Sequence, residues 1–412
     1  MIPAWLPGQT HSLLDFALRS VLPDGGFGWL DETGGIDRSQ GRPLWITARM
    51  THVMAIGEVM NHAGCAEAVE HGLAALTGLF HDARNGGWYA SVGWDGSPTD
   101  TKKSAYQLAF VILAAASAVA AGHRNARPLL GDALEISSRH FWDEGHGMIV
   151  DDWDETFSHL DSYRGVNSNM HTVEAYLAAA EALDMMGDET APLWRERISA
   201  ICARVIGRDA RDNQWRVQEH YDPDWHPMPG YNRDRPADQF RPFGAIVGHG
   251  LEWSRLCLQV MVSLPNPPDW LSAAAVALFQ RAVADGWHAD GNDGFVYTTD
   301  WDGVPVVHER MHWTLAEALG AGAALQAAGL LDTTGHTDRW WIFADAHVID
   351  HEHGGWHHEL NRFNQPSTTV WRGKPDVYHA IQACVLAGLP VVPAIVPALT
   401  NRPDPTPGAG TS

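Results

Sequence analysis

Three histidines carry the strongest chemical signal, because each stands near the start of a helix-like run. His171 opens one such run, His249 precedes Glu252 by three residues, and His379 follows Asp376 by three. Residues three or four apart share one face of a helix. The positive end of a helix dipole disfavours imidazole protonation, and a neutral imidazole can act as a general acid or base. We therefore predict that His171, His249 and His379 are catalytic.

The same register recurs in other helix-like runs, which is what distinguishes these histidines among the 23 in the chain. A lone histidine among apolar residues is usually structural, so the shared position carries the argument. Asp376, Glu252 or Glu317 could orient the imidazoles. The polar and aromatic residues that we predict to bind substrate at this level are Trp45, Arg49, Tyr106, Asn167, Glu252, Trp313, Glu317 and Asp376.

A short turn motif, rich in glycine or aromatic residues, must position these side chains, since it recurs six times along the chain. Measured from Gly28, successive copies are 59, 60, 67, 80 and 61 residues apart. A repeated turn followed by helices is typical of a repeat architecture. The six copies are Phe27-Gly28-Trp29, Gly86-Gly87-Trp88-Tyr89, Gly147-Met148-Ile149, Asn213-Gln214-Trp215, Gly294-Phe295-Val296 and Gly354-Gly355-Trp356.

Helical periodicity dominates the segments between the turns, and many of these segments are rich in alanine and apolar on most sides. We predict an all-α fold, an (α/α)6 barrel of six helical hairpins with short β-hairpin turns. All inner helices would then point the same way, with their N-terminal ends at one mouth.

We expect residues 1–392 to form a single catalytic domain and the Pro-rich residues 393–412 to form a flexible tail. Residues 218–243 lengthen the fourth repeat and are typical of a lid or binding loop. The predicted helices cover residues 44–60, 105–121, 171–183, 251–262, 270–284, 314–328 and 377–386.

Composition excludes several classes of function. The formal net charge of −22 disfavours nucleic acid and anionic membranes as partners. The longest apolar run, residues 108–121, is too short to span a bilayer. The four cysteines lack metal-ligand spacing, and no third ligand completes the His-x-x-Glu pairs as a zinc site, so we predict no metal and no cofactor. No signal peptide is evident, and we expect a cytoplasmic monomer or homo-oligomer.

The chain resembles the N-acylglucosamine 2-epimerase superfamily over nearly its whole length. The resemblance is closest to its aldose–ketose isomerase branch, which contains mannose isomerases and sulfoquinovose isomerases. The segments that carry it are Gly26-Phe27-Gly28-Trp29-Leu30, Leu44-Trp45-Ile46-Thr47-Ala48-Arg49-Met50, Asn167-Ser168-Asn169-Met170-His171, Gly248-His249-Gly250-Leu251-Glu252-Trp253 and Asp376-Val377-Tyr378-His379.

This resemblance implies an (α/α)6 barrel that uses no metal and moves a proton between C2 and C1 of an open-chain sugar through a cis-enediol. It implies that His379 is the main proton-transfer base and that His249 is the second acid or base. His171 would help with ring opening or contact hydroxyls. Arg49, Tyr106, Asn167, Glu252, Trp313 and Glu317 would line the pocket.

The chain departs from the sulfoquinovose isomerases at the positions that hold the sulfonate. Gln239, His358 and Pro375 stand where those enzymes carry an arginine and two glutamines, although Arg241 remains nearby. Loss of a cationic donor and two amides removes most of an anion site. We therefore expect a monosaccharide substrate that is neutral, with D-mannose to D-fructose as the reaction and D-lyxose to D-xylulose as a further one.

Other functions remain open at this level. A 2-epimerase acting on mannose or an N-acylglucosamine would use His249 and His379 on opposite faces of C2, and a sulfoquinovose isomerase would need a rebuilt anion site. A glycoside hydrolase needs two carboxylates that flank the bond, with Glu252, Glu317 and Asp376 as candidates. A non-catalytic binding role would leave the three histidines without a purpose. Fold alone decides none of these.

Overall fold

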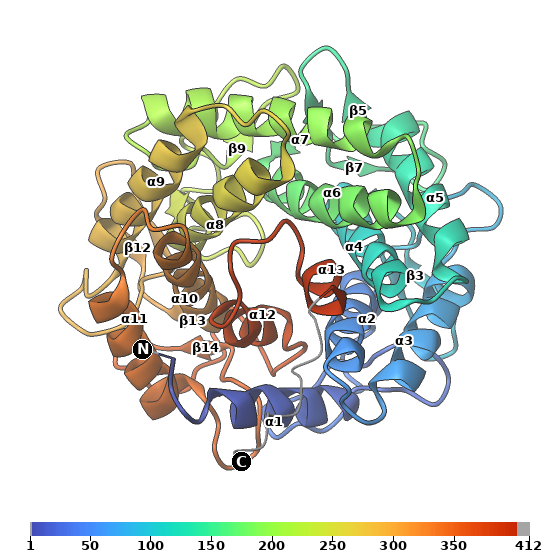
Figure 1. Ribbon diagram of the computed structural model, residues 1–412, viewed down its shortest axis with the longest axis horizontal. Helices are drawn as coiled ribbons and strands as arrows, with labels where there is room; N and C mark the ends of the chain where they lie inside the picture. Colours follow the sequence, from blue (N-terminus) through green and yellow to red (C-terminus); the bar gives the residue numbers. More distant parts are fainter. Residues whose placement is uncertain (1, 402–412) are drawn as a thin grey trace, which may run out of the picture.

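Twelve helices form two concentric rings in the computed structural model, which describes residues 2–401 (Figure 1). Along most of the chain each inner helix is followed by an outer helix that runs back beside it. The predicted (α/α)6 barrel is confirmed. The inner ring consists of α2 (Leu44–Val59), α4 (Ala105–Ala121), α6 (Val166–Met186), α8 (Val247–Ser263), α10 (His312–Ala327) and α12 (Tyr378–Leu386). The outer ring consists of α1 (Leu6–Leu18), α3 (Cys65–Ala74), α5 (Ala126–Ile136), α7 (Ala191–Arg204), α9 (Trp270–Gly286) and α11 (Thr334–Phe343).

The sixth hairpin is built from both ends of the chain. Helix α1, the first outer helix, packs against α12, the last inner helix, and this contact closes the ring. Four outer helices continue directly into a short π-helical turn. These turns are η1 (Ala75–Leu79), η2 (Ser137–Phe141), η3 (Val205–Ala210) and η4 (Ala344–Val348).

Burial explains why the inner helices are apolar on all sides. In α4 the run from residue 107 to residue 120 is buried without a break, because outer helices cover one side and the barrel interior the other. A helix in such a position needs no polar face. None of the helices in the described part of the chain has the length and apolarity needed to cross a membrane.

Short antiparallel strands join neighbouring repeats at the mouth of the ring. The strand just before an inner helix pairs with a strand of the next repeat, as β1 (Arg42–Pro43) does with β2 (Ser91–Val92). The other such pairs are β4 (Lys103–Ser104) with β7 (Asp152–Trp153), β8 (Arg164–Gly165) with β9 (His220–Tyr221), β10 (Ala245–Ile246) with β11 (Thr298–Thr299), and β13 (Arg310–Met311) with β14 (Glu359–Leu360). The hairpin partners are β3 (Pro98–Asp100), which pairs with β2, β12 (Pro305–Val307), which pairs with β11, and β5 (Trp142–Asp143), which pairs with β6 (Met148–Ile149).

Several predicted helix boundaries differ from the structure. Helix α6 begins at Val166 and α8 at Val247, five and four residues before the predicted starts at residues 171 and 251. Helix α12 begins at Tyr378, one residue after the predicted start at residue 377, and the Tyr378 amide donates a hydrogen bond to Asp376 at 3.0 Å.

The C-terminal segment also differs from the predicted tail. Residues 395–400 form helix α13 (Ile395–Thr400), whose residues Ile395, Val396 and Pro397 are buried. This helix packs against α2, α4 and α6, and Figure 1 shows it inside the ring. The flexible tail was therefore predicted to begin too early; the remainder of that prediction, residues 402–412, lies outside the described residues.

Candidate active site

A pocket of about 560 Å³ opens where the N-terminal ends of the inner helices converge. Every inner helix contributes at least one residue from its first turns, as the repeat register predicts. The lining residues are Trp45, Arg49, Tyr106, Asn167, His171, Gln239, Phe240, Ile246, His249, Glu252, Tyr297, His312, Trp313, His358, Trp371, Asp376 and His379.

Two layers of side chains build this pocket. The outer layer comes from the second residue of α2, α4, α6, α10 and α12, and the next layer comes from the sixth residue of α2, α6, α8 and α10. Positions two and six lie four residues apart and therefore share one helix face. The second residues are Trp45, Tyr106, Asn167, Trp313 and His379, and the sixth residues are Arg49, His171, Glu252 and Glu317.

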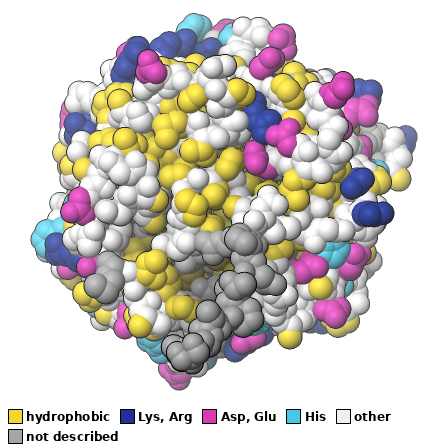
Figure 2. All heavy atoms as spheres, in the orientation of Figure 1, with side chains coloured by type: hydrophobic (Ala, Val, Ile, Leu, Met, Phe, Trp, Pro, Cys, Tyr) yellow, Lys and Arg dark blue, Asp and Glu magenta, His cyan; other side chains and the backbone are white. Residues whose placement is uncertain are grey.

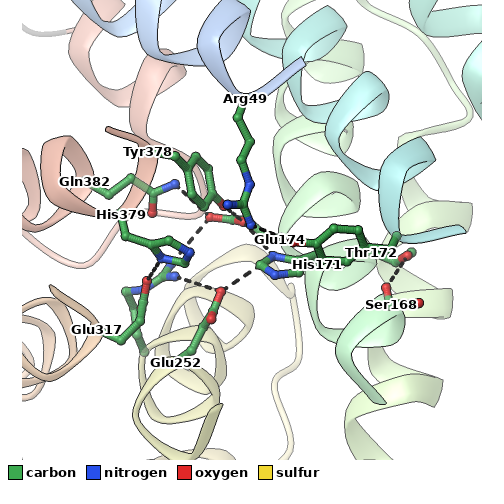
Figure 3. Close-up of polar contacts among 12 residues, drawn as sticks. Arg49, Ser168, His171, Thr172, Glu174, Glu252, Glu317, Tyr378, His379 and Gln382 are labelled. Atoms are coloured by element: carbon green, nitrogen blue, oxygen red, sulfur yellow. Dashed lines mark hydrogen bonds and ion pairs between the residues drawn. The ribbon is translucent and has the colours of Figure 1, made fainter. Parts of the chain in front are cut away.

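His379 is oriented by a buried carboxylate. Its Nδ1 lies 2.9 Å from Glu317 Oε1, and the second oxygen of Glu317 accepts a hydrogen bond from Arg255 Nε at 3.0 Å (Figure 3). An imidazole that donates from Nδ1 keeps a free lone pair on Nε2. Burial, together with the nearby Arg49 charge, lowers the pKa of His379 well below its usual value. The ring is therefore a neutral base facing the pocket.

His249 also has a carboxylate partner, Glu219, which was not among the predicted site residues. Its Nδ1 lies 2.9 Å from Glu219 Oε2, and both side chains are buried. Glu219 stands directly before β9, at the start of the long segment of the fourth repeat. The indole of Trp313 lies between the two bases, with ring centroids 5.4 Å from His249 and 5.7 Å from His379. The pocket thus holds two carboxylate-oriented imidazoles.

His171 lies between two carboxyl groups without a hydrogen bond at Nδ1. This atom is 3.7 Å from both Glu174 and Glu252 (Figure 3). Burial lowers the pKa of His171 to about 4. Burial and the neighbouring Glu317 raise the pKa of Glu252 well above its usual value, which favours its protonated form. Neither of its oxygens has a hydrogen-bond partner among the described residues, but Oε1 lies 3.5 Å from Arg255 Nη2, so Oε2 is the oxygen that can bind a ligand hydroxyl.

The charge of Arg49 is neutralised within the site. Its guanidinium donates to Asp376 Oδ2 at 3.2 Å and to the Tyr106 hydroxyl at 3.0 Å. It also lies 4.3 Å from the ring centroid of Phe110 and 4.7 Å from that of Tyr378. Arg49 is therefore a buried cation whose charge has a partner.

Two uncharged imidazoles lie beside Asp376 in the wall of the pocket. The rings of His312 and His358 are stacked with centroids 3.8 Å apart, and His358 Nε2 lies 3.0 Å from the backbone oxygen of Asp376. Burial lowers the pKa of His358 to about 3 and that of His312 well below its usual value. This wall therefore offers hydrogen bonds but no positive charge.

The three positions that correspond to the sulfonate-binding residues of sulfoquinovose isomerases do not all lie in the pocket. Gln239 and His358 line the pocket, whereas Pro375 does not. Arg241 lies over the ring of Tyr163 at 3.8 Å and forms ion pairs with Asp152 at 3.7 Å and Asp161 at 4.0 Å. Its charge is therefore directed to a neighbouring acidic groove.

Phe240 covers the mouth of the pocket from the long segment of the fourth repeat. Its ring lies 5.5 Å from Trp371, 6.0 Å from Tyr106 and 6.4 Å from Trp45, measured between centroids. Phe240 remains 40% exposed, as expected for a residue at the rim. The predicted lid or binding loop thus contributes directly to the pocket.

Most predicted site residues are brought together, with one difference of placement. Glu317 does not line the pocket but lies behind His379, where it orients the imidazole. His312, one of the residues that prediction missed, stands one position before Trp313 at the start of α10, which was an available signal. The other residues missed as pocket lining are Phe240, Ile246, Tyr297 and Trp371.

Two groups of buried side chains have the spacing to hold a metal ion. One consists of His171, Glu174 and Glu252, and the other of Glu252, Glu317 and His379. Both contain Glu252, whose Oε1 lies 3.5 Å from the guanidinium of Arg255. Glu317 and Glu174 are also engaged with Arg255, at 3.0 and 3.8 Å.

Comparison with known proteins gives a consistent result. The family profile described as N-acylglucosamine 2-epimerase matches residues 25–383. A D-mannose isomerase of Thermobifida fusca is 44% identical over 400 residues, which cover 97% of each chain. A D-mannose isomerase of Pseudomonas cannabina pv. alisalensis is 43% identical and covers 96% of this chain and 95% of its own. A crystal structure of D-mannose isomerase superimposes with a TM-score of 0.85 at 27% identity, over 94% of this chain and 99% of the other.

Proposed function

The chain belongs to the N-acylglucosamine 2-epimerase family, and from this premise we propose that it is a metal-independent isomerase that interconverts D-mannose and D-fructose. The reaction accords with the two relatives that are 43% and 44% identical over nearly the whole chain. The observation that carries the chemistry is the pair formed by His379 and Glu317, at 2.9 Å.

His379 is the base in the proposed mechanism. Its Nε2 removes the proton from C2 of the open-chain aldose, and the electron pair forms the C1–C2 double bond of a cis-enediol as the C1 carbonyl oxygen takes up a proton. The resulting imidazolium returns the proton to C1, while the hydroxyl at C2 loses its proton and becomes the ketone. Glu317 stabilises the imidazolium through Nδ1, as an orienting carboxylate does.

His249 is the second acid and base, and it moves the proton between the two oxygens of the enediol. Glu219 holds its Nδ1, so the opposite nitrogen is available to substrate. His171 and Glu252 are suited to the ring oxygen and hydroxyls, because the raised pKa of Glu252 favours the protonated form, which can donate a hydrogen bond. Ring opening requires such donors before C2 becomes acidic.

The electrostatics of the pocket support a neutral sugar. Among the described residues that line the pocket, Arg49 is the one lysine or arginine, and it is already paired with Asp376. His312 and His358 are uncharged. Hydroxyl groups need only such neutral or paired partners, whereas an anion would lose hydration without a matching charge.

Epimerisation at C2 is the second candidate, because two oriented imidazoles, His249 and His379, flank Trp313. A 2-epimerase would use one base on each face of C2 and return the proton to the same carbon. Both reactions begin with loss of the C2 proton, so they differ only in where the proton returns.

Incubation with D-mannose in D2O, followed by NMR, tests the proposal. Isomerisation yields fructose that carries solvent deuterium at C1, in the fraction of turnovers in which the base exchanges its proton. Epimerisation yields glucose with deuterium at C2. Formation of glucose without fructose would replace the proposal by the epimerase, and absence of both products would refute proton transfer at C2 of mannose.

A further inference from the structure

The far end of the ring is closed by the segment that follows α12. Its carbonyl oxygens at Val392 and Pro393 accept hydrogen bonds from Gln259 Nε2, at 3.1 and 3.5 Å. The hydroxyl of Thr400 donates to the backbone oxygen of Ala120 at the end of α4. Figure 1 shows α13 inside the ring, and Figure 2 shows hydrophobic side chains around the centre of this face. The closing segment is therefore fixed to the C-terminal halves of the inner helices.

A continuous chain of buried contacts leads from this closing segment to the candidate base. Gln259 Oε1 accepts a hydrogen bond from Arg255 Nη1 at 2.7 Å. Arg255 Nε donates to Glu317 Oε2 at 3.0 Å, and Glu317 Oε1 lies 2.9 Å from His379 Nδ1. Arg255, Gln259 and Glu317 are 1%, 4% and 2% exposed, so solvent does not screen these contacts.

We propose that Arg255 is a positioning residue for His379, and that Gln259 and the closing segment hold Arg255 in place. The proposal rests on the assignment of His379 as the proton-transfer base. Arg255 does not line the pocket, so it acts on the substrate only through the side chains that it contacts: Glu317, which holds His379, and Glu252, which lines the pocket.

The charges around Arg255 supply the reason. Its guanidinium lies 3.0 Å from Glu317, 3.5 Å from Glu252 and 3.8 Å from Glu174, so one cation serves three buried carboxyl groups. Burial raises the pKa of Glu317, and the charge and hydrogen bond of Arg255 oppose that rise. A Glu317 that gains a proton on Oε1 can no longer accept from His379 Nδ1. The imidazole then loses the tautomer that leaves Nε2 free.

Substitutions at Arg255 and Gln259 test the proposal through kcat. We expect Arg255→Met to lower kcat for mannose by roughly 10- to 100-fold with KM changed less than about 3-fold, within the contribution of an acid–base group. Arg255→Lys keeps the positive charge but not the planar group of donors of the guanidinium, so it should restore part of the lost kcat. Gln259→Leu leaves Arg255 in the protein and should lower kcat by several-fold, which keeps the test open if Arg255→Met fails to fold.

The pH profile distinguishes positioning from a structural role. Without Arg255, Glu317 loses its proton only at higher pH. The acidic limb of the pH profile of kcat therefore shifts to higher pH. The other ionisable groups that face Glu317 are Glu174, Glu252, His171 and His379, and all of them are unchanged in the variant. Arg216→Met is the matched control, because it removes a buried ion pair with Asp285, at 2.7 Å, and Arg216 does not line the pocket. It should reduce thermal stability and leave both kcat and its pH profile unchanged.

A measurement without substrate separates this proposal from the proposed function. NMR of 15N-labelled histidine reports whether His379 carries its proton on Nδ1, and we expect this signal in the wild type and its loss in Arg255→Met. The same signal in both proteins, or a wild-type kcat in Arg255→Met, would overturn the positioning role. Absence of mannose turnover in the wild type, with the tautomer change present, would instead overturn only the substrate assignment.

Discussion

Glu219 and His249 are 30 residues apart in the chain, yet Glu219 Oε2 lies 2.9 Å from His249 Nδ1. The backbone oxygen of Glu219 accepts a hydrogen bond from the Val166 amide, which begins α6, so the strand pairing of β8 with β9 sets its position. The carboxylate that orients this base therefore comes from the long segment of the fourth repeat that precedes α8, and not from the helix that carries the base.

Replacement of Glu219 by glutamine should lower kcat by roughly 10-fold or more while KM for mannose stays within about 3-fold, since the second acid–base group loses the partner that stabilises its protonated form. Initial rates of fructose formation measure this. The nearby substitution Glu309→Gln is the control, because Glu309 is not a pocket residue. Equal rates for Glu219→Gln and the wild type would contradict the role of His249.

His379→Asn should reduce turnover by about 10²- to 10⁴-fold, the usual contribution of a general base. Asparagine keeps a polar side chain at the second position of α12, so circular dichroism and the melting temperature should stay near those of the wild type. His351→Asn, at an exposed position, serves as the matched histidine control. Retention of near-wild-type turnover in His379→Asn would show that another group removes the C2 proton.

Stability should fall as pH decreases from about 6.5, because buried neutral histidines cannot take up protons that the unfolded chain accepts. Burial lowers the pKa of His52 to about 4, while an unfolded histidine titrates near 6.5. The unfolded state therefore binds more protons between these values, and the unfolding free energy decreases with falling pH in that window.

His52→Gln isolates this effect from the catalytic residues. His52 lies 2.7 Å from Ser117 Oγ, and glutamine can retain a hydrogen bond there without titrating. The free energy of unfolding of the variant should be about 1–3 kcal/mol lower than that of the wild type at pH 7. It should also depend less on pH between about 7 and 4.5. Chemical denaturation at several pH values measures both. A slope equal to that of the wild type would mean that His52 does not titrate differently in the two states.

Activity should survive exhaustive treatment with EDTA, since the carboxyl groups of both candidate metal groups already lie 3.0 to 3.8 Å from the Arg255 guanidinium. Metal analysis of the treated protein provides the control that any ion has been removed. Loss of turnover that returns on addition of Mn²⁺ or Zn²⁺ would require a metal-dependent mechanism.

Mannose should be preferred over sulfoquinovose in kcat/KM. Arg241 is paired with Asp152 and Asp161, and His358 is neutral, so a sulfonate would find no free cationic partner among the described lining residues. Side-by-side kinetics decide the preference. A higher value for sulfoquinovose would imply that Arg241 leaves its acidic partners and enters the pocket.

The sequence predicts the ring and most of its mouth because the repeat sets the register of each inner helix. Trp45, Tyr106, Asn167 and Trp313 could be found by their distance from the repeated turns, since the turn fixes where each helix begins. Phe240 and Glu219 could not be placed, because the long segment of the fourth repeat has no counterpart elsewhere in the chain. The role of Glu317 depends on which neighbouring helix faces it, and spacing within one helix holds no such information.

The C-terminal helix α13 was missed for a related reason. Its six residues are too few for a periodic pattern, and a flanking proline-rich composition is typical of a loop. Its burial against α2 and α4 stabilises the helix, and this tertiary effect outweighs the local preference.

The hairpin shared by α1 and α12 has a consequence for biosynthesis. A nascent chain emerging from the ribosome holds its first outer helix without the partner that arrives more than 350 residues later. Intermediates of translation are therefore open arcs whose end helices expose apolar surface, and such surface invites association with chaperones or with other chains. If a linker joined the two ends of the chain and the chain were opened between two other hairpins, α1 and α12 would be synthesised one after the other. The helices separated until the end of synthesis would then be those of another hairpin.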